Sequence, residues 1–361
     1  MVKVALVGLL LLAIACARDQ VDQPAAAARP GNGLRAIDVH THFGPEVADR
    51  AVLLLERHGI DVAVNLSGLY PGGGLEEQLA AAARHPGRIV VFTSPHWALA
   101  REGPDYGARM ADDLGRAAAL GARGLKISKA LGLAVEDASG RLVAVDAPEL
   151  DPLFERAGQL GMPVAIHTGD PIAFWRRPDA ANERRAELAA HPNWSLWGRA
   201  VPSWDDLQAA LERRIARHPG TTFIAVHFGN APEQPERVAA LLERHPNLYI
   251  DTAARIPEIG RHPAEEMRRL FIEHQDRILF GTDLGIGRTL TLGSSGPEPP
   301  EPADVERFFA ASWRYFESAD RAFPHPTPIQ GDWTIDGIHL PPAVLGKIYR
   351  ANAARLLRLP P

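Results

Sequence analysis

The stretch Ile37-Asp38-Val39-His40-Thr41-His42 ends an apolar run and stands just before the break Gly44-Pro45. Successive side chains of an extended strand alternate between its two faces, so His40 and His42 project to the same side. Two imidazoles at the mouth of a strand can share one metal ion, although two histidines at this spacing are often only a polar strand edge. The rest of the chain has to decide between these interpretations.

Beyond this stretch the chain repeats a short apolar strand, a Gly or Pro break and an amphipathic helix. Runs such as Ile89–Phe92 and Phe223–Val226 are apolar on both faces, which is typical of parallel strands covered on both sides. Eight strands alternating with eight helices predict an α/β fold, a (β/α)8 TIM barrel. The expected strands are Ala36–His40, Asp61–Leu66, Ile89–Thr93, Gly124–Ile127, Pro163–His167, Thr222–His227, Leu248–Asp251 and Ile278–Thr282. The expected helices are Glu46–His58, Leu75–His85, Tyr106–Leu120, Glu149–Leu160, Trp204–His218, Pro232–His245, Pro263–His274 and Ala303–Phe316, followed by a C-terminal helix Pro342–Leu357.

Loop insertions are expected after the fourth, fifth and eighth strands. Val135–Val145 predicts a small hairpin that turns at Ser139-Gly140, and Asp170–Ser203 and Leu284–Pro302 are longer irregular stretches. These insertions follow strands, so they lie on the barrel face where enzymes of this fold have their sites. We expect the two long insertions to act as lids and to set the substrate specificity.

Eight histidines near helix ends are interpreted as surface or capping residues. A histidine in the last turn interacts favourably with the helix dipole, and the proline that follows several of them ends the helix. They are His58, His85, His191, His218, His245, His262, His274 and His325.

A different set of polar residues stands at the carboxyl ends of the expected strands. One histidine at a strand end is more often a core or rim residue. Several such residues on separate barrel strands, however, converge on one mouth of the barrel, which indicates a site. The set consists of His40, His42, Lys126, His167, His227 and Asp283.

These residues and the sequence segments around them resemble the amidohydrolase superfamily, and most closely its amidohydrolase-related branch, family 2. The segments are Ile37–His42, Val164–Pro171 and Phe280–Asp283, and the resemblance extends from about residue 35 to residue 357. The superfamily includes hydrolases of amides, esters and lactones as well as nonoxidative decarboxylases. The resemblance implies a metal site, and our hypothesis is that His40, His42, His167 and Asp283 hold the metal.

Neutral imidazoles and a carboxylate suit zinc, and manganese, iron or nickel also fit a mixed nitrogen and oxygen site. The metal lowers the pKa of a bound water towards ~7. We therefore predict a metal-dependent hydrolase in which activated water attacks a C–N or C–O carbonyl bond of a small molecule. Asp283 would take the proton of the water and pass it to the leaving group, and His227 would polarise the carbonyl or orient the water. The alternatives are nonoxidative decarboxylation of a small carboxylic acid and, further off, a non-catalytic surface binding protein.

The number of metal ions depends on Lys126. In binuclear members of the superfamily a lysine on the fourth strand is carbamylated and bridges two metals, and His227 would then bind the second ion. Lys126 can equally be a free cation for a substrate carboxylate, and Lys129 competes for that part. We favour one ion. Asp38 is either the acceptor for a ligand imidazole or an ordinary buried polar residue.

Further residues are candidates for substrate binding because they follow barrel strands. An arginine at the rim can clamp an acidic group through two hydrogen bonds, and a tryptophan can form an apolar wall. The ordinary alternatives are that such an arginine forms a surface ion pair and that such a tryptophan only packs against its neighbours. The candidates are Arg255, Asn230, His96 and Trp175.

The amino terminus predicts export. Residues 4–15 are apolar or small, and Cys16, the only cysteine, follows in a position that resembles a bacterial lipoprotein cleavage site. We expect a signal peptide with its lipidated Cys16 (1–16), a flexible tether (17–33) and the barrel (34–361). The protein would be secreted across the inner membrane and anchored by lipid at the cell envelope. Cleavage by ordinary signal peptidase would instead leave it periplasmic or extracellular.

The expected partners follow from charge and resemblance. The formal net charge of -5 and the lack of a basic tract argue against nucleic acid as a partner. A small-molecule substrate is expected, with membrane contact only through the lipid anchor. The resemblance is also consistent with a homodimer.

Overall fold

The computed structural model describes residues 28–360. The predicted signal peptide, Cys16 and most of the predicted tether lie outside these residues. None of the helices within residues 28–360 is long and apolar enough to span a bilayer.

Within this part of the chain, eight parallel strands form the centre of the molecule, as the sequence predicts. Each strand pairs with the next along the chain. Two backbone hydrogen bonds then join the end of the series to its beginning, from the Val39 amide to the Phe280 carbonyl (3.0 Å) and from the Asp283 amide to the His40 carbonyl (2.9 Å). The sheet therefore curls into a TIM barrel. The strands are β1 (Ala36–Phe43), β2 (Ile60–Asn65), β3 (Ile89–Thr93), β4 (Gly124–Ile127), β5 (Val164–Ile166), β6 (Phe223–Ala225), β7 (Leu248–Asp251) and β8 (Ile278–Leu279).

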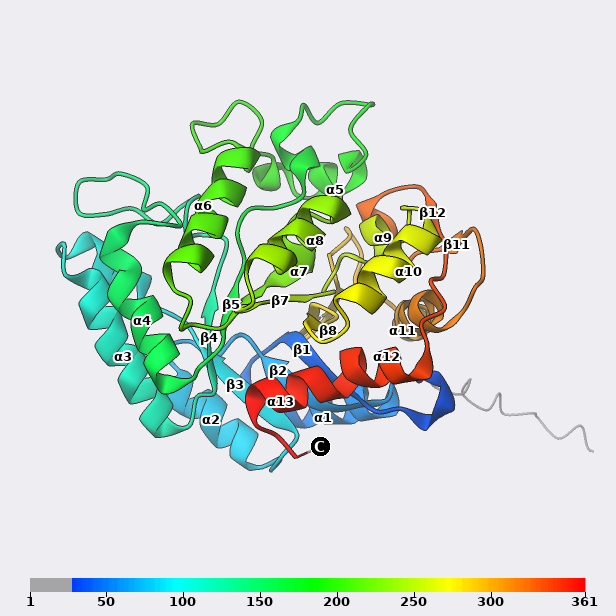
Figure 1. Ribbon diagram of the computed structural model, residues 1–361, viewed down its shortest axis with the longest axis horizontal. Helices are drawn as coiled ribbons and strands as arrows, with labels where there is room; N and C mark the ends of the chain where they lie inside the picture. The colour runs from blue at the N-terminus through cyan, green and yellow to red at the C-terminus, as the bar shows by residue number, and fades with distance from the viewer. Residues whose placement is uncertain (1–27, 361) are drawn as a thin grey trace, which may run out of the picture.

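Helices surround these strands, and the insertion that contains α5 lies on the opposite side of the molecule from the C-terminal helices (Figure 1). The main helices are α1 (Ala48–Arg57), α2 (Leu75–Ala83), α3 (Tyr106–Leu120), α4 (Asp151–Leu160), α5 (Arg185–Ala190), α6 (Trp204–Arg217), α8 (Pro235–Arg244), α10 (Ala264–Glu273) and α11 (Pro302–Glu317). A single turn, α7 (Val226–Gly229), follows β6, and a second one, α9 (Ile256–Ile259), comes after β7. The chain ends in α12 (Pro342–Gly346), a π-helical turn (Lys347–Ala351) and α13 (Asn352–Leu357).

The C-terminal helix α13 covers the amino-terminal end of the barrel. Apolar residues inside the barrel, among them Ile37 and Ile224, pack in one cluster with Ala353 and Leu357 of α13. The Asn352 amide group also donates to the Ile278 carbonyl (2.9 Å) at the start of β8. Because this end is plugged, the carboxyl ends of the strands are left for the site.

The eighth strand is shorter than predicted. β8 ends at Leu279, the chain bends at Gly281-Thr282-Asp283, and β9 (Leu284–Ile286) then pairs with Thr41–Phe43 of β1. Asp283 has φ +62°, a left-handed backbone that interrupts a regular strand. The start of the predicted loop at Leu284–Pro302 is therefore a hairpin, in which β10 (Leu290–Leu292) pairs antiparallel with β9.

Two other local predictions can be compared with the structure. The small hairpin predicted within Val135–Val145 is present, because Glu136 and Leu142 form an antiparallel bridge and the Gly140 amide donates to the Asp137 carbonyl (2.9 Å) at the turn. The insertion Asp170–Ser203, predicted as irregular, contains the helix α5.

The helix-end histidines are in part misassigned. Five of them do stand directly after a helix: His58, His191, His218, His245 and His274. His58, His218 and His274 are buried as well as capping, so among the described residues the prediction of a surface or capping position is wrong only for His325, which is buried and follows no helix. His58 is buried by packing between distant elements, because its ring stacks on Phe309 at 4.2 Å between centroids.

Gly107→Ala is expected to destabilise the protein by about 1–3 kcal/mol, because the added methyl group has no space. A Cβ at Gly107 in α3 would lie 1.7 Å from the Glu149 carbonyl oxygen, which belongs to the backbone. Gly115→Ala in the same helix is the matched control, since its Cβ would meet only the end of the Arg156 side chain at 3.1 Å. Helix propensity makes that variant neutral or more stable by up to about 1 kcal/mol. Urea unfolding measures both.

Candidate metal centre

Three of the predicted metal ligands meet at the carboxyl end of β1. His40 Nε2 lies 3.3 Å from Asp283 Oδ1, and His42 Nε2 lies 3.4 Å from the same oxygen. Asp283 reaches this position because its left-handed backbone turns the chain after β8 and its amide bonds to the His40 carbonyl. The carboxylate therefore faces both imidazoles through one oxygen.

In His40, His42 and His227 the second ring nitrogen, Nδ1, has a hydrogen-bond partner. Nδ1 of His40 lies 2.8 Å from Asp251 Oδ2, and Nδ1 of His42 lies 2.9 Å from Ser67 Oγ. Nδ1 of His227 lies 2.9 Å from the Ala253 carbonyl oxygen, which can only accept a hydrogen bond. His227 therefore has its proton on Nδ1 and a free lone pair on Nε2.

His227 and His167 extend the cluster away from β1. The ring centroids are 4.7 Å apart for His40 and His227 and 4.3 Å apart for His227 and His167. His227 and Phe228 both have a left-handed backbone, with φ of 58° and 57°. Such conformations cost energy in residues other than glycine and are concentrated at functional sites. This backbone conformation places the His227 ring close to both the His40 ring and the His167 ring.

The donor atoms fit a divalent metal. His40 Nε2, His167 Nε2 and Lys126 Nζ are buried without a hydrogen-bond partner among the described residues. In a tetrahedral site with bonds of about 2.0–2.1 Å, neighbouring ligand atoms are roughly 3.3–3.4 Å apart. The separations of 3.3 and 3.4 Å at Asp283 match that spacing.

His167 lies outside the tight group. Ligand atoms of His40, His42 and Asp283 all lie within 4.8 Å of one another, and so do those of His40, His227 and Asp251. His167 belongs to neither of these groups within residues 28–360. Its ligand role stays a prediction, supported by its unpartnered Nε2 in the same cavity.

The ionisation states also suit a metal. Burial lowers the pKa of His40 well below its usual value, and the Lys126 ammonium adds to this effect. Burial similarly holds the pKa values of His167 and His227 well below the usual value. Burial opposes ionisation of Asp283, but the positive charge that His40, His227 and His42 carry when protonated outweighs it and holds the pKa of Asp283 well below the usual range. At neutral pH the cluster therefore offers the neutral imidazoles of His40, His167 and His227 and the carboxylate of Asp283. Burial lowers the pKa of Lys126 to about 8.

A small cavity of about 130 Å³ opens beside these residues. Besides the Asp283 carboxylate, its charged groups are the Lys129–Asp170 ion pair (2.8 Å), the buried Glu187 and the buried Arg255. Phe174 and Trp194 of the insertion after β5 form an aromatic wall. The cavity is lined by Lys129, His167, Asp170, Pro171, Phe174, Glu187, Trp194, His227, Arg255, Asp283, Thr291, Gly293, Ser294 and Gln330.

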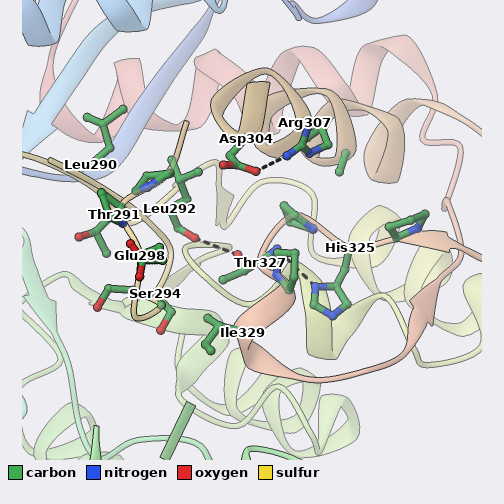
Figure 2. A pocket seen from close by; sticks show the side chains of 18 of the residues that line it. Leu290, Thr291, Leu292, Ser294, Glu298, Asp304, Arg307, His325, Thr327 and Ile329 are labelled. Atoms are coloured by element: carbon green, nitrogen blue, oxygen red, sulfur yellow. Dashed lines mark hydrogen bonds and ion pairs between the residues drawn. The ribbon is translucent and has the colours of Figure 1, made fainter. Parts of the chain in front are cut away.

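A larger cavity of about 790 Å³ lies beside β10. Figure 2 shows it between β10, the chain after it, α11 and the segment around Thr327, whose hydroxyl donates to the Leu292 carbonyl. It shares Thr291 and Ser294 with the small cavity. Within the described part of the chain, none of the clustered histidines lines it. The chemistry therefore belongs to the smaller cavity.

Three predicted substrate-binding residues do not line the small cavity. The His96 ring stacks on Tyr70 at 4.1 Å, and the Trp175 indole donates to the Pro202 carbonyl at 3.0 Å. Asn230 is buried beyond His227, with no partner for its side-chain amide among the described residues. Their substrate roles stay predictions. Arg255 does line the cavity.

Of the two interpretations of Asp38, the structure supports the ordinary buried residue. Its Oδ1 accepts the amides of His40 (3.0 Å) and Thr282 (3.1 Å), and its Oδ2 accepts the Thr282 hydroxyl (2.6 Å). Within residues 28–360 its carboxylate forms no hydrogen bond with an imidazole. The acceptor for a ligand imidazole is Asp251, which the sequence reasoning missed although it is the last residue of an expected strand.

Comparison with known proteins places the chain in a family. Residues 37–359 match the family model described as Amidohydrolase. The chain belongs to the amidohydrolase family. Members of this family are metal-dependent enzymes, and the residues of the cluster are the candidate ligands here. The chain has no significant match among curated proteins.

Solved structures share the fold of this amidohydrolase at low sequence identity. The 2,6-dihydroxybenzoate decarboxylase from Rhizobium is 18% identical with a TM-score of 0.53, and the match covers 90% of this chain and 99% of that one. A TIM-barrel protein from Bordetella bronchiseptica is 18% identical with a TM-score of 0.51, covering 90% and 99%. A dihydroxybenzoic acid decarboxylase from Polaromonas with bound manganese and an inhibitor is 15% identical with a TM-score of 0.51, covering 90% and 97%.

Proposed function

We propose that this amidohydrolase hydrolyses a C–N or C–O carbonyl bond of a small anionic molecule. The proposal is carried by the Asp283 carboxylate, whose Oδ1 lies 3.3 and 3.4 Å from Nε2 of His40 and of His42. A divalent metal bound there would supply an activated water and polarise the substrate carbonyl. Zinc suits this donor set best, and manganese, which the Polaromonas neighbour binds, is the alternative.

Asp283 and His227 have separate tasks in this proposal. Asp283 directs Oδ1 towards the two imidazoles, so its second oxygen is available to take a proton from water and deliver it to the leaving group. His227 carries its proton on Nδ1, so Nε2 can only accept a hydrogen bond. This tautomer suits a residue that orients the attacking water and does not suit one that donates to a carbonyl.

Arg255 supplies the charge that selects the substrate. The guanidinium is buried, donates through Nη1 only to the neighbouring Ala254 carbonyl (3.0 Å), and forms no salt bridge within residues 28–360. Its Nε has no hydrogen-bond partner in the same part of the chain. A buried guanidinium is stabilised by an anionic partner, and a substrate carboxylate in the small cavity would provide one.

Arg255→Leu is expected to raise KM for an anionic substrate by about 10–100-fold, because a hydrogen bond between charged groups contributes roughly 1.5–3 kcal/mol. Steady-state kinetics on the substrate that the native enzyme consumes measures the effect. Arg261→Leu is the control, since Arg261 binds Glu183 (2.7 Å) outside the cavity. A KM for Arg255→Leu equal to the native value would remove Arg255 from substrate binding.

The second candidate function is nonoxidative decarboxylation of a small carboxylic acid. The unpaired Arg255 beside His227 favours a carboxylate substrate, and two structural neighbours are named as decarboxylases of such acids. In this reaction the metal would anchor the substrate and a proton would be delivered to carbon. Release of CO2 without consumption of any amide, ester or lactone bond would favour this candidate over hydrolysis.

One experiment separates these functions. Zinc-loaded and manganese-loaded protein is screened with amides, esters, lactones and aromatic carboxylates, and metal content is measured by elemental analysis. We expect hydrolysis of one carboxylate-bearing substrate and one ion per chain, with Lys126 unmodified by mass spectrometry. Two ions and a carbamylated lysine would contradict the single-ion proposal. Ligand binding by metal-free protein with no turnover would instead support a binding protein.

A further inference from the structure

Asp251, the last residue of β7, connects two histidines of the site through one carboxylate. Oδ2 lies 2.8 Å from His40 Nδ1, while Oδ1 accepts the backbone amides of His227 (2.7 Å) and Ala253 (3.1 Å). The side chain is fully buried. His227, whose amide donates to Oδ1, has φ 58°, so the same carboxylate stabilises the strained turn after β6.

We propose that Asp251 is a positioning residue that fixes the proton of His40 on Nδ1 and holds the backbone of His227. A carboxylate can only accept, so the His40 ring donates from Nδ1 and directs the Nε2 lone pair towards Asp283. This role belongs to metal binding and holds whichever reaction the site catalyses. Its test is therefore separate from the substrate screen.

The geometry argues against Asp251 as a metal ligand, although its oxygens lie close to two histidines. The distance of 2.8 Å between Asp251 Oδ2 and His40 Nδ1 is a hydrogen-bond length. Two ligand atoms of a tetrahedral site would be roughly 3.3 Å apart. Oδ1 is already engaged by two amides, whereas His40 Nε2 has no hydrogen-bond partner among the described residues. The metal therefore belongs on the Nε2 side of the ring.

Asp251→Asn tests the proposal because asparagine has the same shape and a different pattern of donors. If the asparagine NH₂ group faces His40, it meets the N–H group on His40 Nδ1, and two hydrogen-bond donors oppose each other. If the NH₂ group faces the other way, it meets the backbone N–H groups of His227 and Ala253, which are also donors. The first conflict is relieved when the His40 proton moves to Nε2, which blocks metal binding. We expect Zn²⁺ affinity to fall by about 10–100-fold, measured by competition with a chromophoric chelator.

Asp38→Asn is the matched control. Asp38 is buried to the same degree, and its Oδ1 also accepts two backbone amides. Its Oδ2 accepts the Thr282 hydroxyl, which can rotate and become the acceptor for an asparagine amide. The two variants therefore differ in whether the second oxygen serves an imidazole. We expect Zn²⁺ affinity of Asp38→Asn within about threefold of the native value.

A spectroscopic measurement on metal-free protein tests the tautomer directly. In the long-range ¹H–¹⁵N spectrum of histidine-labelled protein, we expect a protonated Nδ1 for His40 in the native chain and in Asp38→Asn, and a protonated Nε2 in Asp251→Asn. A native His40 with its proton on Nε2 overturns the proposal even if the variant fails to fold. A folded Asp251→Asn with native zinc affinity also overturns it. So does a native protein that binds two metal ions of which Asp251→Asn loses one, because Asp251 would then be a metal ligand.

Discussion

Asp283→Asn is expected to lower turnover by on the order of 10³–10⁴-fold and to weaken metal binding at the same time. The variant removes the negative charge that faces His40 and His42 and leaves an amide that cannot take a proton from water. The fold should survive, because asparagine tolerates the left-handed backbone at this position, where φ is +62°. The measurements are turnover of the substrate found in the screen and Zn²⁺ content after dialysis.

Asp276→Asn is the control for this substitution. Asp276 stands just before β8, is mostly exposed, and pairs with Lys347 at 2.8 Å. Loss of such a surface pair changes stability by about 0–1 kcal/mol and should leave metal content unchanged. If Asp283→Asn kept both its metal and native turnover, the carboxylate would be neither ligand nor proton acceptor, and the proposed function would lose its basis.

The barrel could be predicted because its signals are local. Each strand is a short apolar run, most are followed by a Gly or Pro break, and α3 lies at Tyr106–Leu120 as predicted from its apolar spacing. The convergence of strand ends follows from the fold, which is why His40, His42, His227 and Asp283 could be grouped before their distances were known. The same rule applied to Leu248–Asp251 would have found Asp251.

The remaining errors arise from interactions that no local pattern carries. The pairing of β1 with β2 shifts register between Asp38 and Thr41, so simple alternation of faces does not describe this stretch. Asp38 bonds to Thr282, a residue far away in the sequence, and has no hydrogen bond to an imidazole within residues 28–360. His58 is buried by Phe309 for the same kind of reason. Partners of this type become visible only when the chain is folded.

Phe280→Ala is expected to lower the free energy of unfolding by about 3–5 kcal/mol. The ring is fully buried and lies 4.7 Å from Trp313, 5.5 Å from Tyr349 and 6.3 Å from Phe316, measured between centroids. It joins the end of β8 to α11 and to the C-terminal segment, so its removal leaves a cavity among three rings. Chemical denaturation in the presence of a chelator measures the change without a contribution from bound metal.

Leu53→Ala provides the comparison, since Leu53 is 69% exposed and its truncation should change stability by less than about 0.5 kcal/mol. Phe280 also stands three residues before Asp283, and its carbonyl accepts the Val39 amide that joins the two ends of the barrel. We therefore expect zinc affinity to weaken in Phe280→Ala, because the strand that carries Asp283 loses its support. A loss of stability below about 1 kcal/mol would mean that the three aromatic neighbours close the cavity, and the bend at Asp283 would then depend on its own hydrogen bonds and not on the packing beneath it.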